Sequence, residues 1–314
     1  MKPTILVLMS SYNGENYLEE QIHSLINQKN INLKILIRDD GSTDSTVKII
    51  ESFTKCYTDY FLPIEKGCNI GCAESFRWLL NKAFTLIHDY DYFAFCDQDD
   101  VWMEEKLFVA SNALQNLSKN KPCMYCSNLK VVDEKLNFIG YMRNHHYNFE
   151  KGRSLVESVA TGCTMLFNKK VLEIFHYYPP QKIRLHDLWV YHMCIFLGEI
   201  FYDTNSYILY RQHSNNEIGA KITFYSRLKS KAKSLKILFS QHEREMEAKE
   251  LLSVYNNILN SEDKKTIYML ANFRQNIKFR CKLLFLKPSL CHSIAMSKKS
   301  DNVFLKIRIL IGCV

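Results

Sequence analysis

The sequence predicts an α/β protein built around a parallel β-sheet. The chain has 314 residues, of which 47% are hydrophobic and 24% charged, so it can bury the core of one large domain or of a domain with an appendage. Its first 55 residues contain two units in which an apolar run is followed by polar residues and then by apolar residues at helical spacing. Strands that alternate with helices in this way pair in parallel, through right-handed crossovers.

The two N-terminal units share one plan. Each strand is a continuous apolar run, as expected where both faces of a strand are buried, and each helix has apolar residues three and four apart. Asp44 or Thr43 is a suitable N-cap for the second helix. The expected elements are strands at 4–9 and 33–37 and helices at 17–26 and 45–53.

The middle of the chain continues the alternation less regularly. A helix is expected after Asn69-Ile70-Gly71, and an aromatic strand ends at Cys96. Gly162 interrupts a later strand, which is typical of a backbone that approaches a ligand or a neighbouring strand closely. The expected elements are helices at 69–83 and 186–197 and strands at 92–96, 122–133, 159–167 and 207–210.

Three carboxylates, those of Asp97, Asp99 and Asp100, follow the aromatic strand within four residues. Carboxylates this close repel one another unless a cation lies among them. Asp97 and Asp99 are two residues apart, so an extended backbone would direct both to one face, where they could hold a divalent ion. The alternative is an Asp-rich turn that caps a helix beginning near Met103, with Asp100 at its start. The local pattern leaves both interpretations open.

Three polar loops, at 10–14, 39–44 and 97–100, directly follow predicted strands. Ligands of open α/β sheets bind beyond the carboxyl ends of the strands, so these loops are expected to form one site. The chain has neither a GxGxxG nor a GxxxxGK[ST] loop, which argues against the usual dinucleotide and P-loop modes of phosphate binding. A nucleotide bound here would need acidic groups and a metal for its phosphates.

Two later segments are also candidates for function. His186 and Asp187 open an expected helix, where Asp187 is either an N-cap or a general base. The polar residues 211–216 either contact phosphate or metal or form a surface loop. The adjacent His145 and His146 are expected in a surface loop rather than at a metal.

The eleven cysteines are expected to be reduced, because no apolar run is long enough for an export signal or a membrane span. We therefore expect a cytoplasmic protein. Cys123 and Cys126 form a CxxC inside a predicted strand, and no second CxxC is present to complete a zinc site. Buried free thiols are the simpler interpretation.

The net charge of +8 is unevenly distributed. Residues 220–314 hold 19 Lys and Arg against 7 Asp and Glu, whereas residues 1–219 hold 22 against 26. Three amphipathic helices are expected in this basic region, at 222–239, 243–259 and 266–286. They either lie on an anionic membrane surface or pack on the preceding domain with solvated Lys and Arg. Nucleic-acid binding is not expected, because no aromatic-basic recognition motif is present.

In their order along the chain these motifs resemble the family 2 glycosyltransferases of the GT-A fold, and within them a bacterial rhamnosyltransferase-like branch. The resemblance covers residues 1 to about 219 and implies a catalytic domain with a Rossmann-like mixed sheet flanked by helices, followed by the basic helical region 220–314. The motifs that carry it are Ser10-Ser11-Tyr12-Asn13-Gly14, Asp39-Asp40-Gly41-Ser42-Thr43-Asp44, Asn69-Ile70-Gly71, Cys96-Asp97-Gln98-Asp99-Asp100, Thr161-Gly162-Cys163-Thr164, His186-Asp187-Leu188-Trp189 and Tyr210-Arg211-Gln212-His213-Ser214-Asn215-Asn216.

The resemblance implies roles for individual residues. Asp99 matches the direct ligand of a Mn²⁺ or Mg²⁺ ion, with Asp97 and His213 close to it, and Asp187 matches the base that activates the acceptor. The donor nucleotide is then expected at Ser11, Tyr12, Asn13, Asp39, Asp40, Asn69, Gly71 and Asp97. The acceptor or diphosphate is expected near Gly162, Cys163, His186, Trp189 and Arg211.

The resemblance also implies the reaction, an inverting sugar transfer in the synthesis of a surface polysaccharide such as a capsule or O-antigen. The branch favours dTDP-L-rhamnose as the donor, although UDP-hexoses use the same scaffold. The acceptor would be a glycan, free or linked to a lipid diphosphate, reached from the inner face of the membrane. Burial and neighbouring carboxylates would raise the pKa of Asp187 and make it a better base.

Two other function classes are less favoured by these residues. A non-catalytic binding module for nucleotide sugars or glycans needs no base, so Asp187 would have no role in it. A nucleotidyltransferase normally has a glycine-rich, basic phosphate loop near its N-terminus, and residues 10–14 contain no basic side chain.

Overall fold

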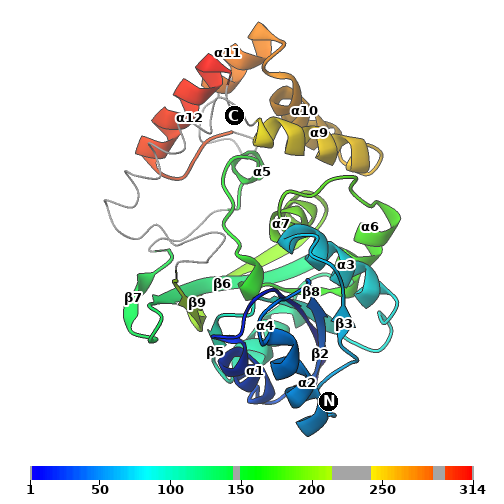
Figure 1. Cartoon of the computed structure of the whole chain (residues 1–314). Helices are drawn as coiled ribbons and strands as arrows, with labels where there is room; N and C mark the ends of the chain where they lie inside the picture. The colour runs from blue at the N-terminus through cyan, green and yellow to red at the C-terminus, as the bar shows by residue number, and fades with distance from the viewer. Residues whose placement is uncertain (1, 144–148, 214–241, 286–293, 313–314) are drawn as a thin grey trace.

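The protein, seen in a computed structural model, is an α/β structure whose described residues form one mixed sheet of nine strands (Figure 1). The structure describes residues 2–143, 149–213, 242–285 and 294–312. The strand order is β3-β2-β1-β4-β8-β6-β9-β5, and β7 pairs with β6 beside this path. The predicted fold class is therefore confirmed.

The strands are β1 (Thr4–Ser11), β2 (Asn32–Asp39), β3 (Glu65–Lys66), β4 (Tyr92–Cys96), β5 (Val101–Trp102), β6 (Cys123–Val132), β7 (Phe138–Tyr141), β8 (Leu166–Asn168) and β9 (Glu199–Arg211). The helices of the first 213 residues are α1 (Leu18–Ile26), α2 (Thr46–Cys56), α3 (Cys72–Phe84), α4 (Lys106–Gln115), α5 (Lys151–Ser154), the 3₁₀ turn η1 (Gly162–Thr164), α6 (Lys169–Tyr177) and α7 (His186–Leu197). Those after residue 241 are α9 (Glu243–Tyr255), α10 (Ser261–Asn272), α11 (Ile277–Phe285) and α12 (Lys299–Ile311).

The sheet is buried on both faces, as its continuous apolar runs predicted. Side chains of β1 alternate between two cores: Leu6 and Leu8 pack with α3 and α7, whereas Val7 and Met9 pack with α1 and α2. Helix α4 completes the second layer and α6 the first, so the sheet lies between two layers of helices (Figure 1).

The N-terminal half of the sheet is parallel, and its strand ends meet at one edge. Ser11 at the end of β1 pairs with Asp39 at the end of β2, and Met9 pairs with Cys96 at the end of β4. The loops that follow these strands therefore leave the sheet at the same edge, as the sequence predicted.

The second half of the sheet mixes directions. Strand β8 is antiparallel to both β4 and β6, and β9 then runs parallel to β6. Strand β9 spans 13 residues, far more than the predicted strand at 207–210. The predicted strand at 159–167 is wrong over most of its length, because residues 162–164 form η1 and only 166–168 pair.

The segment after the acidic loop also differs from prediction. Asp100 does not begin a helix: it precedes the two-residue strand β5, which pairs with β9, and α4 begins only at Lys106. The pairing of Val101 with Leu209 ties this end of the acidic loop to the sheet.

The C-terminal helices α9 and α10 pack against the layer formed by α7 (Figure 1). Tyr255 of α9 is buried against Trp189 of α7, with ring centroids 5.5 Å apart. The helix predicted at 266–286 is two helices, α10 and α11, and α12 was not predicted. The predicted helix at 222–239 and the residues His145 and His146 lie outside the described residues.

Among the described residues, no helix combines the length and the apolar character needed to cross a bilayer.

Candidate functional site

The first two loops at the carboxyl edge are joined by hydrogen bonds. The side chain of Asn13 accepts a hydrogen bond from the backbone N–H of Thr43 (2.9 Å), and the Asn13 N–H donates to Ser42 Oγ (3.0 Å). Gly14 N–H donates to Thr46 Oγ1 (2.7 Å). Asn13, a predicted nucleotide contact, therefore holds the two loops together.

Asp39 is buried and its acceptor capacity is used within its own loop. It accepts hydrogen bonds from the backbone N–H groups of Gly41 (3.1 Å) and Ser42 (3.0 Å). The hydroxyls of Ser42 and, more distantly, of Ser11 (3.4 Å) donate to the other oxygen. A carboxylate offers about four acceptor positions, so Asp39 is saturated. Asp39 and Ser11 thus shape the loop, and Ser11 itself is fully buried.

Asp40 is also buried but keeps one acceptor position. Its oxygens accept from the backbone N–H groups of Ile70 (3.0 Å) and Gly71 (2.9 Å). Its third partner is the buried guanidinium of Arg38, which sequence reasoning missed. Asn69 supports the same turn by accepting from Gly71 N–H (3.1 Å). With about one position left, Asp40 is better placed than Asp39 to accept from a base or ribose.

Tyr12 presents an exposed ring on a firmly held backbone. The Gln98 side chain accepts from Tyr12 N–H (2.8 Å) and donates to Tyr12 O (2.9 Å). The ring is 45% exposed, so one face is available for stacking on a nucleobase. Gln98, a second residue that the sequence reading missed, thereby joins the first loop to the acidic loop. Its place between Asp97 and Asp99 was the only signal for it.

The acidic loop is held by β9 and the residues after it. Asp99 Oδ2 lies 2.8 Å from His213 Nε2. The backbone N–H of Arg211 donates to Asp100 Oδ1 (3.2 Å), and Arg211 Nε donates to the carbonyl of Asp99 (3.0 Å). Arg211 is buried and also pairs with Glu20, so it supports the loop, and its predicted place near the diphosphate stays a prediction. The predicted proximity of Asp99 and His213 is present, whereas residues 214–216 lie outside the described residues.

The acidic loop also approaches η1, through Asp97, Asp100 and Cys163. One ligand atom from each lies within 4.8 Å of the others. Burial, followed by the charges of Asp99 and Asp97, raises the pKa of Asp100 well above its ordinary value. Burial likewise raises the pKa of the Cys163 thiol. Asp100 is thus a buried member of the acidic loop, not the helix cap that the sequence suggested.

Lys106 is the buried cation beneath this loop. Its ammonium group lies 3.3 Å from the ring centroid of Trp102, and burial lowers its pKa to about 8. The carboxylate of Asp100, when ionised, acts in the opposite direction and favours the charged form of Lys106. Its position after Asp100 in a predicted helix gave no sign that it would be buried.

The donor set of the acidic loop fits a hard divalent cation. The carboxylates of Asp97 and Asp99 and the imidazole of His213 are ligands that Mn²⁺ accepts, and the carboxylates suit Mg²⁺. The neutral thiol of Cys163 suits neither ion. A cation among these carboxylates would also relieve the repulsion that raises the pKa of Asp100.

Asp187 lies in the first turn of α7, partly buried, with both oxygens oriented. Oδ2 accepts from the backbone N–H of Gly162 (3.1 Å), and Oδ1 accepts from that of Leu188 (2.7 Å). Burial raises the pKa of Asp187, against the lowering effect of these two hydrogen bonds and of Arg184. The predicted direction is confirmed, but neighbouring carboxylates are not among its causes.

Gly162 brings Asp187 and the acidic loop into one site. A Cβ at Gly162 would lie 3.0 Å from His186 Nε2 and 3.4 Å from the Cβ of Asp187, so only glycine lets η1 approach the start of α7 without displacement. Cys163, the next residue, has its Sγ within 4.8 Å of a carboxylate oxygen of Asp97 and of one of Asp100. The turn η1 therefore touches the predicted base on one side and the acidic loop on the other.

His186 and Trp189 pack in the core, and their predicted place beside the acceptor stays a prediction. The His186 ring stacks on Phe76 with centroids 3.8 Å apart, and burial lowers its pKa to about 3, so it is neutral at physiological pH. Trp189 is buried against Tyr255. Both side chains point into the core because they sit on the inner face of α7.

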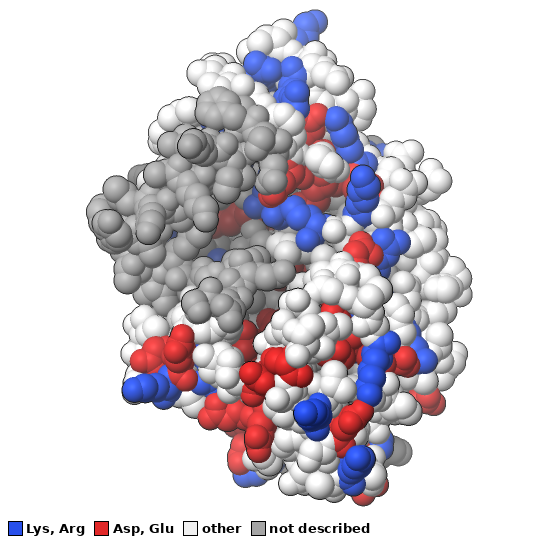
Figure 2. Space-filling model, in the orientation of Figure 1, with Lys and Arg blue, Asp and Glu red and all other residues white. Residues whose placement is uncertain are grey.

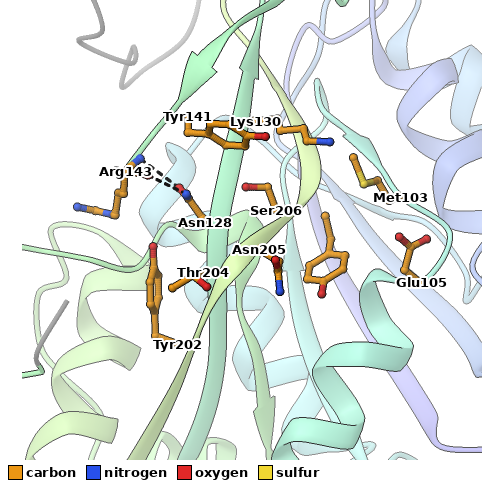
Figure 3. A pocket seen from close by; sticks show the side chains of 11 residues that line it. Met103, Glu105, Asn128, Lys130, Tyr141, Arg143, Tyr202, Thr204, Asn205 and Ser206 are labelled. Atoms are coloured by element: carbon orange, nitrogen blue, oxygen red, sulfur yellow. Dashed lines mark hydrogen bonds between the residues drawn. The ribbon is translucent and has the colours of Figure 1, made fainter. Parts of the chain in front are cut away.

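A separate surface cleft of about 790 Å³ lies along β6, β7 and β9 (Figure 3). Its floor is held by Asn128, which donates to the carbonyl of Arg143 (2.8 Å) and accepts from its N–H (3.1 Å). The lining residues are Met103, Glu105, Asn128, Lys130, Tyr141, Arg143, Tyr202, Thr204, Asn205, Ser206 and Tyr207. None of the predicted site residues lines this cleft, so it is distinct from the site at the carboxyl edge.

Comparison of the sequence with protein families gives a match to glycosyl transferase family 2 over residues 6–175. A "dTDP-rhamnosyl transferase RfbG" of Shigella flexneri is 33% identical over 235 residues, which cover 70% of this chain and 77% of that protein. An "Uncharacterized glycosyltransferase RT0329" of Rickettsia typhi is 24% identical over 216 residues, or 67% of this chain and 64% of that protein.

The fold is similar to that of TarS from S. aureus, crystallised as residues 1–349 in complex with UDP-GlcNAc. The TM-score is 0.55 at 16% sequence identity, and the match covers 91% of this chain and 76% of that one. At this identity the comparison supports the fold alone, which is that of a GT-A glycosyltransferase.

Proposed function

The chain belongs to glycosyltransferase family 2, and we propose that it is a metal-dependent, inverting enzyme that transfers L-rhamnose from dTDP-L-rhamnose to a saccharide. One observation carries the proposal: η1 joins Asp187, a carboxylate with oriented oxygens, to the acidic loop that follows β4. A displacement at a sugar carbon requires a base for the attacking hydroxyl and a site that holds the leaving diphosphate. Asp187 and the acidic loop would supply these two groups from the two sides of η1.

The proposed donor nucleotide lies over the first two loops. Tyr12 stacks on the thymine ring with its exposed face, and Asp40 accepts a hydrogen bond from the base or ribose with its remaining oxygen position. The ion pair with Arg38 orients Asp40. The choice of dTDP-L-rhamnose is supported by the 33% identity to a protein named as a dTDP-rhamnosyl transferase.

The proposed metal is Mn²⁺ or Mg²⁺, held by Asp99 and Asp97 with His213 adjacent. When bound, the ion offsets the negative charge that develops on the departing diphosphate. The protein's own contribution is to hold the carboxylates still, through Arg211 at the backbone of Asp99 and Asp100.

The proposed base is Asp187. A carboxylate oxygen of Asp187 accepts the proton of the acceptor hydroxyl. At the same time the hydroxyl oxygen of the acceptor attacks the anomeric carbon from the face opposite the diphosphate. The bond between the anomeric carbon and the phosphate oxygen breaks, its electrons leave with dTDP, and the configuration inverts. Gly162 N–H and Leu188 N–H orient the carboxylate for this transfer.

We further propose that the acceptor is a glycan of a growing surface polysaccharide, free or linked to a lipid diphosphate. The enzyme would then act in the cytoplasm, on the inner face of the cell membrane. The basic composition of residues 220–314 supports this location.

A panel of nucleotide sugars tests the proposal. The protein is incubated with Mn²⁺ and dTDP-L-rhamnose, or with UDP-glucose, UDP-galactose or UDP-GlcNAc, and the released products are identified by chromatography. We expect dTDP from dTDP-L-rhamnose and little UDP from the others. Release of UDP but not of dTDP would show that the donor is a UDP-sugar. Pyrophosphate release would indicate a nucleotidyltransferase, and no release despite donor binding would indicate a binding module.

A further inference from the structure

The helices α11 and α12 expose large apolar side chains that no described part of the chain covers. Those on α11 are Ile277 and Phe285, four residues to either side of the exposed Cys281. On α12 the exposed residues Val303, Ile307 and Leu310 have the spacing i, i+4, i+7 of one helix face. With Ile311 of α12, these six apolar side chains are 49–82% exposed. We call Val303, Ile307 and Leu310 the outward stripe.

Helix α12 is apolar on two opposite faces. Leu305 and Ile309 are buried and hold the helix against the rest of the molecule. The stripe of Val303, Ile307 and Leu310 points the other way, toward solvent. A helix that only packed on the core would have polar residues there, so the second face is explained by a further partner.

The charges around these residues are almost all positive. Residues 277–312 contain eight Lys and Arg and a single acidic residue, Asp301. Lys278 and Lys282 on α11 and Lys306 on α12 are exposed beside the apolar stripes. Figure 2 shows Lys and Arg at the upper end of the molecule, where Figure 1 places the C-terminal helices. Exposed apolar residues flanked by Lys are typical of helices that lie in the surface of an anionic bilayer.

We propose that α11 and α12 form a docking surface for an anionic lipid bilayer. The 13 residues of α12 are too few to span a membrane, so the helix lies in the plane of the interface with its outward stripe among the lipid chains and its Lys at the headgroups. The inference rests on the proposed function in one respect: membrane docking would keep the enzyme beside a membrane-borne acceptor. Lipid binding itself requires no sugar transfer.

Helices α11 and α12 are attached to the catalytic part through a continuous core. Arg280 of α11 donates to the carbonyl of Leu310 on α12 (3.4 Å), so the two helices are joined. Leu283 and Leu305 belong to the same core as Trp189 of α7. A membrane contact at α11 and α12 would therefore hold the whole catalytic sheet at the bilayer rather than a loosely linked tail.

Sedimentation with vesicles tests the proposal on the full chain. The probes are vesicles of phosphatidylcholine alone and of phosphatidylcholine mixed with phosphatidylglycerol. We expect binding to the mixed vesicles, weakened by salt, and little binding to phosphatidylcholine alone. Absence of binding to both would overturn the proposal.

Substitutions at the outward stripe locate the contact. The triple variant Val303→Ser, Ile307→Ser, Leu310→Ser should bind mixed vesicles at least about tenfold more weakly, because each side chain removed from lipid loses apolar burial. The matched control, Tyr177→Ser with Met246→Ser, removes exposed apolar residues from α6 and α9 and should bind as the wild type does. Unchanged binding by the triple variant would contradict the proposal.

Two further measurements separate the alternatives. If the wild type is a dimer that the triple variant converts to a monomer, a second copy of the chain covers the stripe and the lipid proposal fails. Donor turnover without vesicles should be equal in both proteins, since Val303, Ile307 and Leu310 belong to none of the three loops, to η1 or to the start of α7. A wild type that releases dTDP without binding vesicles would contradict only this inference, whereas a wild type that binds vesicles without releasing dTDP would contradict only the proposed function.

Discussion

The carboxylate of Asp187 combines partial burial with two backbone hydrogen bonds. Burial favours its neutral form, whereas the N–H groups of Gly162 and Leu188 favour the carboxylate. The outcome is a raised pKa with a fixed orientation, which suits a group that must accept a proton during the reaction.

The pH dependence of turnover follows from this shift. Only deprotonated Asp187 can accept the proton, so turnover at saturating donor should rise with pH through its pKa. Because burial raises that pKa above the ordinary 3.8, the acid limb should have its midpoint above 3.8. A pH–rate profile measures it, and turnover that stays constant down to pH values near 3.8 would argue against Asp187 as the base.

Gly162→Ala tests the contact between η1 and α7. The added Cβ would meet His186 Nε2 at 3.0 Å and the Cβ of Asp187 at 3.4 Å, so the start of α7 must shift. A displacement of a few tenths of an ångström at the base should lower kcat by about 10- to 100-fold, with little change in donor affinity. Thermal unfolding of the variant is the control, and wild-type kcat in a folded variant would contradict the assignment.

At the scale of the elements, the acidic loop depends on contacts that come from distant parts of the chain. Gln98 holds the first loop, and Arg211 holds the backbone at Asp99 and Asp100. The sequence predicted that the three loops share one edge, because strands that alternate with helices run in parallel and so end at the same edge. It did not predict Arg38 or Lys106, since whether a basic residue is buried depends on its tertiary partner.

Asp99→Ala tests the metal role of the acidic loop. Loss of this carboxylate should reduce affinity for dTDP-L-rhamnose at least about tenfold in Mn²⁺, since the diphosphate would lose its anchor. Affinity measured by calorimetry without metal should change far less. Glu104→Ala, which removes an exposed carboxylate close by in sequence, should behave as the wild type does. Equal Mn²⁺-dependent affinity in Asp99→Ala would remove Asp99 from the metal site.

The strands of the second half of the sheet were the least predictable elements. Strand β9 is 13 residues long, but polar residues, of which Thr204 and Asn205 are exposed, interrupt it, so its sequence resembles a strand only near Tyr207 to Tyr210. The turn η1 lies in a segment that the sequence predicts as strand; Cys163 within it and Met165 after it are buried. Burial in both cases comes from neighbouring elements rather than from local periodicity.

At the scale of the whole molecule, the C-terminal helices are part of the fold. Leu251 and Tyr255 of α9 and Leu270 of α10 are buried in the core that contains α3 and α7. Salt bridges add to the contact: Lys151 of α5 pairs with the buried Asp263 of α10 (2.7 Å). The sequence left open whether these helices pack on the core or lie on a membrane, because amphipathic spacing does not identify the partner. The structure places α9 and α10 in the core.

Tyr255→Ala tests this shared core. Removal of the buried ring beside Trp189 should cost about 3–5 kcal/mol and lower the Tm of the whole protein in one transition. Tyr268→Ala, at a half-exposed position on α10, should change the stability far less. If calorimetry instead showed two transitions, of which only one moved, the C-terminal helices would be a separate folding unit.

The measurement that tests sugar transfer by this site most directly compares turnover and donor binding in Asp187→Asn. The substitution keeps the shape of the side chain but removes the proton acceptor, so dTDP release should fall by about 10²- to 10⁴-fold. Calorimetric affinity for dTDP-L-rhamnose with Mn²⁺ should stay within about twofold of the wild type, because the hydrogen bonds of Asp187 go to Gly162 and Leu188 and involve neither the first two loops nor the acidic loop. Wild-type turnover in this variant would contradict Asp187 as the base.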